Sequence, residues 1–201
     1  EKSSVGATGN VLMACINLNE EVIIKNAAME PEIVDLCDFI EKMGVNIEGR
    51  GTSELKVTGI KKNNNEVVIE HDVIPDRIEA GTFLIAAAIT KSRLTISNVI
   101  PEHLSIVTEK IKKAGCNIIE NDKSITLIPC DNIKPVNVVT DIYPGFPTDL
   151  QAQWVVLMAL AHGESSVKDT IYIDRFSHIP ELNRLGASIS LDDNVAHIKG
   201  V

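Results

Sequence analysis

The chain has 201 residues, of which 44% are hydrophobic and 23% charged, a composition that excludes disordered and collagen-like proteins. We expect a compact soluble protein of one large or two small domains. Its longest apolar runs, such as Trp154 to Ala161, have about eight residues, whereas a membrane-spanning helix needs roughly 20. The formal net charge of -9 argues against nucleic acid as a partner, because a phosphate backbone is bound by clustered Lys and Arg.

The cysteines and histidines predict no disulfide framework and no metal site. Neither residue type shows metal-ligand spacing, and the chain opens without a signal peptide. We expect a cytoplasmic protein in which all the cysteines have core or incidental roles. Because the chain opens with Glu and ends directly after a strand pattern, we expect a piece of a longer protein. The cysteines are Cys15, Cys37, Cys116 and Cys130.

A repeated unit organises the chain. Gly44, Gly115 and Gly186 lie 71 residues apart, and each is followed by a small residue, a polar residue and Ile. Each glycine follows apolar residues at helical spacing, which predicts a helix C-cap. The sequence therefore predicts three copies of a unit with the order helix, strand, helix, strand, strand.

In chain order, each unit begins with a helix that is apolar on nearly all sides and that we expect to be enclosed by protein. A strand, a helix with one polar face and a hairpin of alternating polarity follow. The pattern predicts an α/β fold in which buried helices are surrounded by sheets. The first helices are predicted at 11–18, 83–89 and 154–161, the strands after them at 21–26, 93–98 and 165–169, and the hairpins at 46–58, 117–128 and 188–199.

The likeliest domain boundary is the crossing from Asp72 to Pro75, after a predicted loop at 61–65 and a predicted strand from Val67 to His71. Residues 1–73 would then be part of one lobe and hold one repeat. Residues 74–201 would be part of a second lobe and hold two.

The first candidate site directly precedes the first apolar helix. Lys2, Ser3, Ser4, Val5 and Gly6 lead into that helix, where free backbone N–H groups and the helix dipole suit a phosphate. The alternative is an ordinary Ser N-cap. The spacing matches neither a P-loop nor a dinucleotide-binding fingerprint.

The second candidate is Asp149, which a stiff turn from Pro144 delivers to the start of the third apolar helix. One interpretation is a carboxylate kept ionised by the helix N-terminus and available as a general base. The alternative is a plain helix start, because Thr148 and Gln151 have the spacing of a capping box.

Four further charged residues are weaker candidates, and for Arg175 the simpler explanation is a solvated charge at a helix start. Asp76 and Arg77 precede the second apolar helix and could form only a surface ion pair. Arg175 is predicted to open the third amphipathic helix, where it could offer a fixed cation to an anionic ligand. Glu30 precedes Pro31 at a predicted helix start.

Five longer strings resemble the UDP-N-acetylglucosamine enolpyruvyl transferases, or 1-carboxyvinyltransferases. The resemblance implies two lobes of three repeats each. It also implies transfer of an enolpyruvyl group from phosphoenolpyruvate to the 3-hydroxyl of UDP-N-acetylglucosamine, with release of phosphate and no metal or cofactor, in peptidoglycan synthesis. The strings span 4–8, 26–35, 74–83, 101–104 and 144–153.

The resemblance also implies roles for single residues. Asp149 would take the proton from the sugar hydroxyl, Ile171 would contact the nucleotide sugar, and Arg175 would lie close to the substrates. The sequence departs from the family at 172–174, where Tyr-Ile-Asp replaces Phe-Glu-Asn. The segment that would hold the UDP phosphates consists of Lys2, Ser3, Ser4 and Val5, with Gly6 adjoining.

Other residues that the family uses match no position in this chain: a Lys-Asn pair, arginines that bind phosphoenolpyruvate, and a loop cysteine that donates a proton. We therefore expect the chain alone to be inactive, and its exposed apolar surface to cause self-association. Two alternatives stay open. One is an enzyme like 5-enolpyruvylshikimate-3-phosphate synthase, and the other is a non-catalytic module that binds a nucleotide sugar or is purely structural.

Overall fold

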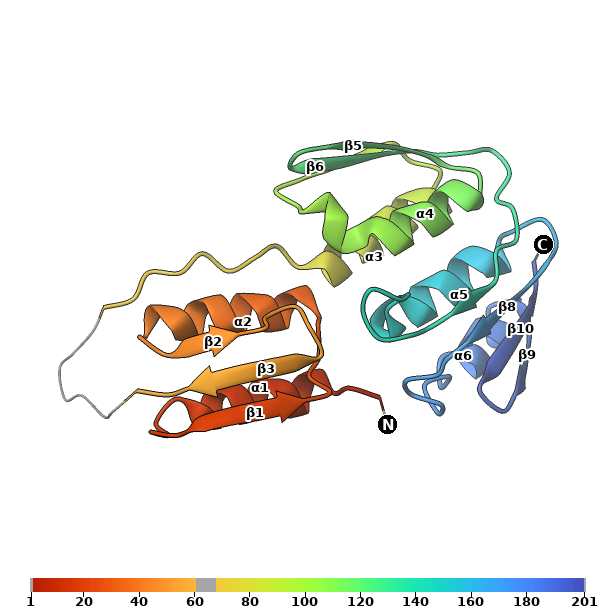
Figure 1. The fold of residues 1–201 in the computed structure, drawn as a ribbon. Helices are drawn as coiled ribbons and strands as arrows, with labels where there is room; N and C mark the ends of the chain where they lie inside the picture. The colour runs from red at the N-terminus through yellow and green to blue at the C-terminus, as the bar shows by residue number, and fades with distance from the viewer. Residues whose placement is uncertain (1, 61–67, 201) are drawn as a thin grey trace. The chain divides into compact units, whose positions relative to one another are not determined.

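The computed structural model describes residues 2–60 and 68–200. The chain divides into two compact units, Glu1–Ile74 and Pro75–Val201, and each has its own hydrophobic core (Figure 1). The predicted loop at 61–65 and the first residue of the predicted strand at 67–71 lie outside the described residues. The rest of that prediction is wrong, because residues 68–71 form no strand. In this segment the Glu70 carbonyl accepts a hydrogen bond from the side chain of Lys42, whose Nζ lies 2.8 Å away.

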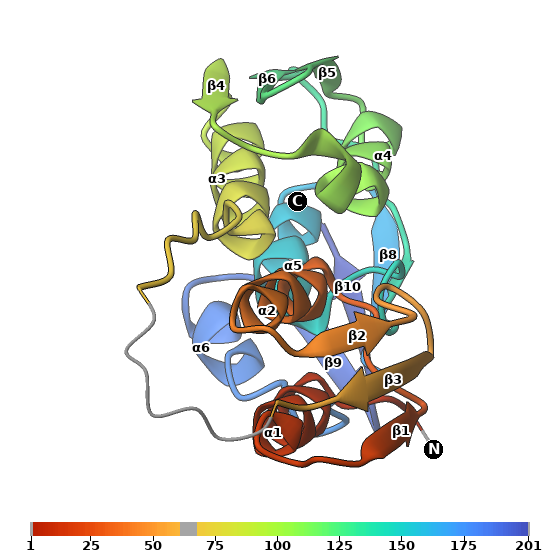
Figure 2. The same cartoon turned by 60° about the vertical axis from the view of Figure 1, so that its left-hand side comes forward.

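The first unit contains one repeat, in the predicted order. Its antiparallel sheet has the strand order β1-β3-β2, and both helices cover one face of it (Figure 2). Because side chains alternate between the two faces of a strand, Leu55 and Val57 of the central strand lie in the core beneath the helices. The elements are α1 (Val5–Cys15), β1 (Glu21–Lys25), α2 (Pro31–Lys42), β2 (Asn46–Glu48) and β3 (Glu54–Thr58).

The second unit contains two repeats. The first of them has a sheet in the order β4-β6-β5, which matches the order in the first unit. Its elements are α3 (Arg77–Ile89), β4 (Leu94–Ser97), the 3₁₀ helix η1 (Pro101–Leu104), α4 (Ser105–Lys113), β5 (Asn117–Asn121) and β6 (Ser124–Ile128).

The last repeat adds a strand to the same plan. The short strand β7 pairs in parallel with β8, which gives a sheet in the order β7-β8-β10-β9. The sequence analysis did not predict β7. The elements are β7 (Val138–Val139), the 3₁₀ helix η2 (Thr148–Leu150), α5 (Gln151–Ala159), β8 (Glu164–Lys168), α6 (Ile179–Arg184), β9 (Ser188–Asp192) and β10 (Val195–Lys199).

The helices α3 and α5 pack against each other in the core of the second unit, as expected for buried helices, but α3 is not enclosed on every side because Phe83 is 53% exposed. Leu84 of α3 and Trp154 of α5 are fully buried there. A hydrogen bond also joins α3 and α5, in which Gln153 Nε2 donates to Thr82 Oγ1 at 3.0 Å. The sheet of the second repeat packs on α3, and the sheet of the third repeat packs on α5.

The three repeat glycines adopt the conformation predicted for them. Gly44, Gly115 and Gly186 have φ angles of +99°, +105° and +102°, in the left-handed region where a side chain causes strain. Each follows the last turn of an amphipathic helix, so each ends its helix as a C-cap motif does.

Two predictions about helices are wrong. The helix α1 is not enclosed within its unit, because Val11 and Met13 are 42% and 49% exposed and only one sheet and one helix pack on it. The third amphipathic helix begins at Ile179, so Arg175 lies in the loop before it. Pro180 in the first turn explains this start, since proline fits only the beginning of a helix.

In the described part of the chain, every helix falls short of the length and hydrophobicity that crossing a membrane requires.

Candidate active site

The turn before η2 is anchored in the core of the second unit. Two backbone hydrogen bonds close it, from Asp141 N to Phe146 O at 3.0 Å and from Gly145 N to Ile142 O at 2.7 Å. The Phe146 ring is 2% exposed and packs edge-on against Trp154, with 5.5 Å between the ring centroids. This anchoring fixes the backbone that leads to Asp149.

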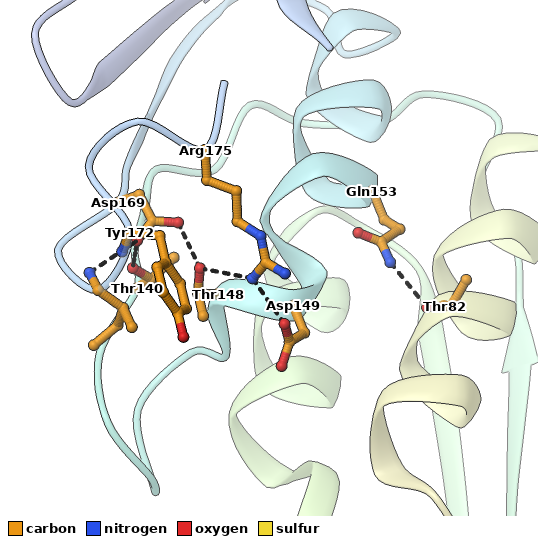
Figure 3. A network of polar contacts seen from close by, with 9 residues as sticks. Thr82, Thr140, Thr148, Asp149, Gln153, Asp169, Tyr172 and Arg175 are labelled. Carbon is orange, nitrogen blue, oxygen red and sulfur yellow. Dashed lines mark hydrogen bonds and ion pairs between the residues drawn. The ribbon is translucent and has the colours of Figure 1, made fainter. Parts of the chain in front are cut away.

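Asp149 forms an ion pair with Arg175 at the surface of the unit (Figure 3). Arg175 Nη1 donates to Asp149 Oδ1 at 2.7 Å and to Thr148 Oγ1 at 3.2 Å. The two charged side chains are 51% and 44% exposed, so solvent screens their attraction and a ligand can approach either group. The structure thus brings together two of the residues proposed from the sequence.

Asp169 holds this arrangement from within. It is 0% exposed, and its carboxylate accepts hydrogen bonds from Thr140 Oγ1 at 2.8 Å and Thr148 Oγ1 at 2.7 Å. The backbone N–H groups of Ile171 and Tyr172 also donate to it, both at 2.9 Å. Four donors compensate for the loss of water around a buried carboxylate.

The loop after β8 carries the other site residues. Because Asp169 binds the N–H of Ile171, it places Ile171 beside the turn that bears Thr148. The Arg175 guanidinium lies over the Tyr172 ring, 5.2 Å from its centroid, which is a cation–π geometry (Figure 3). The network therefore links Asp149, Ile171 and Arg175 through one buried carboxylate.

The sequence analysis missed Asp169. In the sequence, Asp169 was indicated only by its position at the end of a predicted strand, where polar side chains are common. The capping box predicted at this helix start is absent, because the Thr148 hydroxyl donates to Asp169 and no side chain caps the start, although Asp149 does lie in the first turn of η2. The Gln151 side chain is buried, and among the described residues neither of its polar atoms has a hydrogen-bond partner.

The N-terminal segment, in the first unit, forms the expected helix start. Ser4 is the N-cap of α1, and its Oγ accepts a hydrogen bond from Ala7 N at 3.2 Å. Behind it, Thr8 Oγ1 accepts from Ala28 N at 3.0 Å, which fixes the first turn to the rest of the unit. A Cβ on Gly6 would meet nothing within 4 Å, so the space beside this residue is open.

The remaining candidates have structural roles. Asp76 is the N-cap of α3, where Oδ1 accepts from Ile78 N at 2.7 Å and Glu79 N at 3.1 Å. Arg77 lies over the Tyr143 ring at 5.5 Å. Glu30 is the N-cap residue of α2, with Pro31 at its first position as predicted.

Burial keeps two of the cysteines, Cys37 and Cys116, unreactive as catalytic nucleophiles. Burial raises the pKa of the Cys37 and Cys116 thiols to about 11, so both are protonated at neutral pH. Cys15 is also buried, and Cys130 is partly buried. Within residues 2–60 and 68–200, no three His, Cys, Asp or Glu side chains gather in a way that could hold a metal ion.

Comparison with known proteins places the chain in a family. The profile of the EPSP synthase (3-phosphoshikimate 1-carboxyvinyltransferase) family matches residues 1–201, so the chain belongs to that family. The enolpyruvyl transferase NikO from Streptomyces tendae has the same fold, with a TM-score of 0.86 at 22% sequence identity over 98% of this chain and 46% of its own.

Closer relatives confirm the resemblance seen in the sequence. The UDP-N-acetylglucosamine 1-carboxyvinyltransferase of Chlorobaculum parvum is 49% identical over 198 residues, which are 98% of this chain and 46% of that protein. The protein of the same name from Hydrogenovibrio crunogenus is 48% identical over 202 residues, covering 100% of this chain and 48% of the relative. The chain thus spans about half the length of the curated relatives that it matches.

Proposed function

We propose that this chain belongs to an enzyme that transfers the enolpyruvyl group of phosphoenolpyruvate to the 3-hydroxyl of UDP-N-acetylglucosamine and releases phosphate. The observation that carries the proposal is the 49% identity along nearly the whole chain to a protein named for that reaction. This reaction would be the first committed step of peptidoglycan synthesis, and its expected location is the cytoplasm.

Asp149 is the proposed base. The Arg175 contact uses Oδ1, and the other carboxylate oxygen is the proposed acceptor of the proton from the sugar hydroxyl. The oxygen of that hydroxyl would then attack the carbon of phosphoenolpyruvate that bears the phosphate, while the neighbouring CH2 carbon takes a proton from a donor in the part of the protein that this chain does not span. Phosphate would leave in a later elimination, in which that carbon gives up a proton and the double bond forms again. Thr148 and Asp169 keep the turn in place, which supports a base that must stand at a fixed position.

The nucleotide sugar would contact two further parts of the chain. Ile171 and Arg175, held beside Asp149 by the Asp169 network, would contact the sugar and its charged groups. Lys2 and the open first turn of α1, from Ser4 to Gly6, would hold the UDP phosphates through backbone N–H groups and one ammonium group.

The two compact units support a proposal about the larger protein. We propose that the first unit is part of one lobe and that the second unit is part of the other, since the units contain one and two repeats of the same plan. The rest of the site would then come from the half of the protein that this chain does not span.

The test measures phosphate release from phosphoenolpyruvate with UDP-N-acetylglucosamine, on this chain and on the full-length protein that contains it. We expect release only from the full-length protein, and a loss of about 10²- to 10⁴-fold in kcat for Asp149→Asn, because general base catalysis contributes that much. Asp122→Asn, in the exposed β5–β6 turn, is the matched control and should leave the rate unchanged.

Three outcomes would contradict the proposal. An unchanged kcat in Asp149→Asn would exclude Asp149 as the base. Faster turnover with shikimate 3-phosphate than with UDP-N-acetylglucosamine would favour the synthase alternative. Saturable binding of UDP-N-acetylglucosamine by calorimetry, with no turnover by the full-length protein, would favour a non-catalytic module.

A further inference from the structure

Two thiols lie in contact in the second unit, outside the candidate active site. The Sγ atoms of Cys116 and Cys130 are 3.5 Å apart. Cys116 follows the C-cap glycine of α4, and Cys130 lies two residues after the end of β6. The Cys130 thiol also donates a hydrogen bond to the Ala114 carbonyl, at 3.8 Å.

The fold itself brings the two cysteines together. The strands β5 and β6 pair with Asn117 opposite Ile128, so the residues just outside this pair meet at the open end of the hairpin. Gly115 has no side chain and so leaves room for the Cys130 thiol. A Cβ at this position would make a tight contact of 3.4 Å with Cys130 Sγ. The left-handed conformation of Gly115 turns the chain from α4 into β5 at this point.

We propose that Cys116 and Cys130 form a site of reversible disulfide formation, oxidised by a low-molecular-weight disulfide such as oxidised glutathione. A disulfide bond is about 2.05 Å long, and the two sulfur atoms, already in contact at 3.5 Å, would have to come closer by about 1.5 Å to form one.

The order of reaction follows from the exposure of the two thiols. Cys130 is partly exposed, whereas Cys116 is 5% exposed and burial raises its pKa to about 11. The Cys130 thiolate therefore attacks glutathione disulfide first and releases one glutathione thiolate, which takes up the proton that Cys130 lost. Cys116 then loses its proton and attacks Cys130 Sγ in the mixed disulfide, and the second glutathione leaves and takes that proton. In sum, two protein thiols are oxidised and one glutathione disulfide is reduced to two glutathione thiols.

The experiment uses the reduced protein carrying Cys15→Ala and Cys37→Ala, which leaves only the proposed pair. After incubation with oxidised glutathione, we expect complete loss of free thiols and an intact mass lower by two hydrogen atoms, with both thiols restored by dithiothreitol. The control adds Cys130→Ala, and there Cys116 should remain a free thiol without bound glutathione, because it is buried.

The wild-type protein provides a second measurement in case the double variant folds poorly. Trypsin cleaves after Lys123, between the two cysteines, so the oxidised protein should yield the two peptides linked, and reduction should separate them. Persistent glutathione on Cys130, disulfide-linked dimers, or two thiols that stay free under these conditions would each overturn the proposal.

Discussion

Asp149 and Asp169 are both carboxylates of the second unit, but their surroundings give them different roles. Asp149 is 51% exposed and meets one cation, so it remains accessible to a substrate. Asp169 is fully buried and accepts hydrogen bonds from two hydroxyls and two backbone N–H groups. It therefore acts as a positioning residue for the turn that carries Asp149.

The change Asp169→Asn tests this positioning role. We expect the free energy of unfolding to fall by about 1–3 kcal/mol, because the new amide group would point a donor at existing donors and leave one of them unpaired. Urea denaturation of wild type and variant measures the difference. Asp122→Asn, on the exposed β5–β6 turn, should stay within about 0.5 kcal/mol of wild type. A similarly small effect of Asp169→Asn would contradict the role.

His178 should make stability depend on pH. Burial lowers its pKa below the ordinary value of 6.5, and its Nε2 is buried without a hydrogen-bond partner in the described structure. The unfolded chain then binds a proton more readily than the folded chain. The stabilisation is therefore complete above pH 6.5 and is lost as the pH falls toward the folded-state pKa.

Thermal unfolding at pH 7 and pH 5 measures this effect. We expect Tm to fall less for His178→Gln than for wild type over this interval. His197→Gln, at an exposed position of β10, serves as the control and should behave as wild type. Equal decreases in wild type and in His178→Gln would refute the assignment to His178.

At the residue scale, the sequence indicated three candidate residues and missed the buried residue that holds them in place. Asp149 and Arg175 were found from their positions at predicted helix starts, and Ile171 was found through the resemblance to a known family. Asp169 was not, since its importance lies in four hydrogen bonds from segments between 140 and 172, and chain order does not reveal such contacts.

At the scale of helices and strands, local patterns predicted the repeat well. The three hairpins agree with prediction to within one residue, because alternating polarity and a preceding glycine define them locally. Errors occurred where a tertiary contact decided the structure. Thr148 bonds to Asp169 and so forms no capping box. Arg175 pairs with Asp149 from the loop before α6, whose first turn contains Pro180.

The start of α3 offers a test of element stability. Asp76 accepts hydrogen bonds from two N–H groups that are otherwise unpaired in the helix, so Asp76→Ala should lower the free energy of unfolding by about 1 kcal/mol. Asp76→Asn is the matched control, since asparagine caps helices nearly as well as aspartate. Chemical denaturation of the three proteins gives the comparison, and equal losses in both variants would mean that capping is not the cause.

At the scale of the whole molecule, the exposed apolar side chains of α1 predict self-association. Val5, Val11 and Met13 of this helix are 38%, 42% and 49% exposed, and an apolar surface of this kind favours contacts between chains. We expect the sedimentation coefficient to rise with protein concentration. Val11→Lys should reduce the rise, whereas Leu185→Lys, at an 85% exposed position of the second unit, should not. A single monomeric species at all concentrations would contradict this prediction.

The hydrogen bond between Thr82 and Gln153 joins residues that are 71 positions apart, the period of the repeat. Two copies of the unit therefore touch at corresponding positions of α3 and α5, and each copy forms the other's packing surface. At this contact the short Thr82 faces the long Gln153, so the two copies differ where they meet. The hairpins, by contrast, keep the same strand order in both copies.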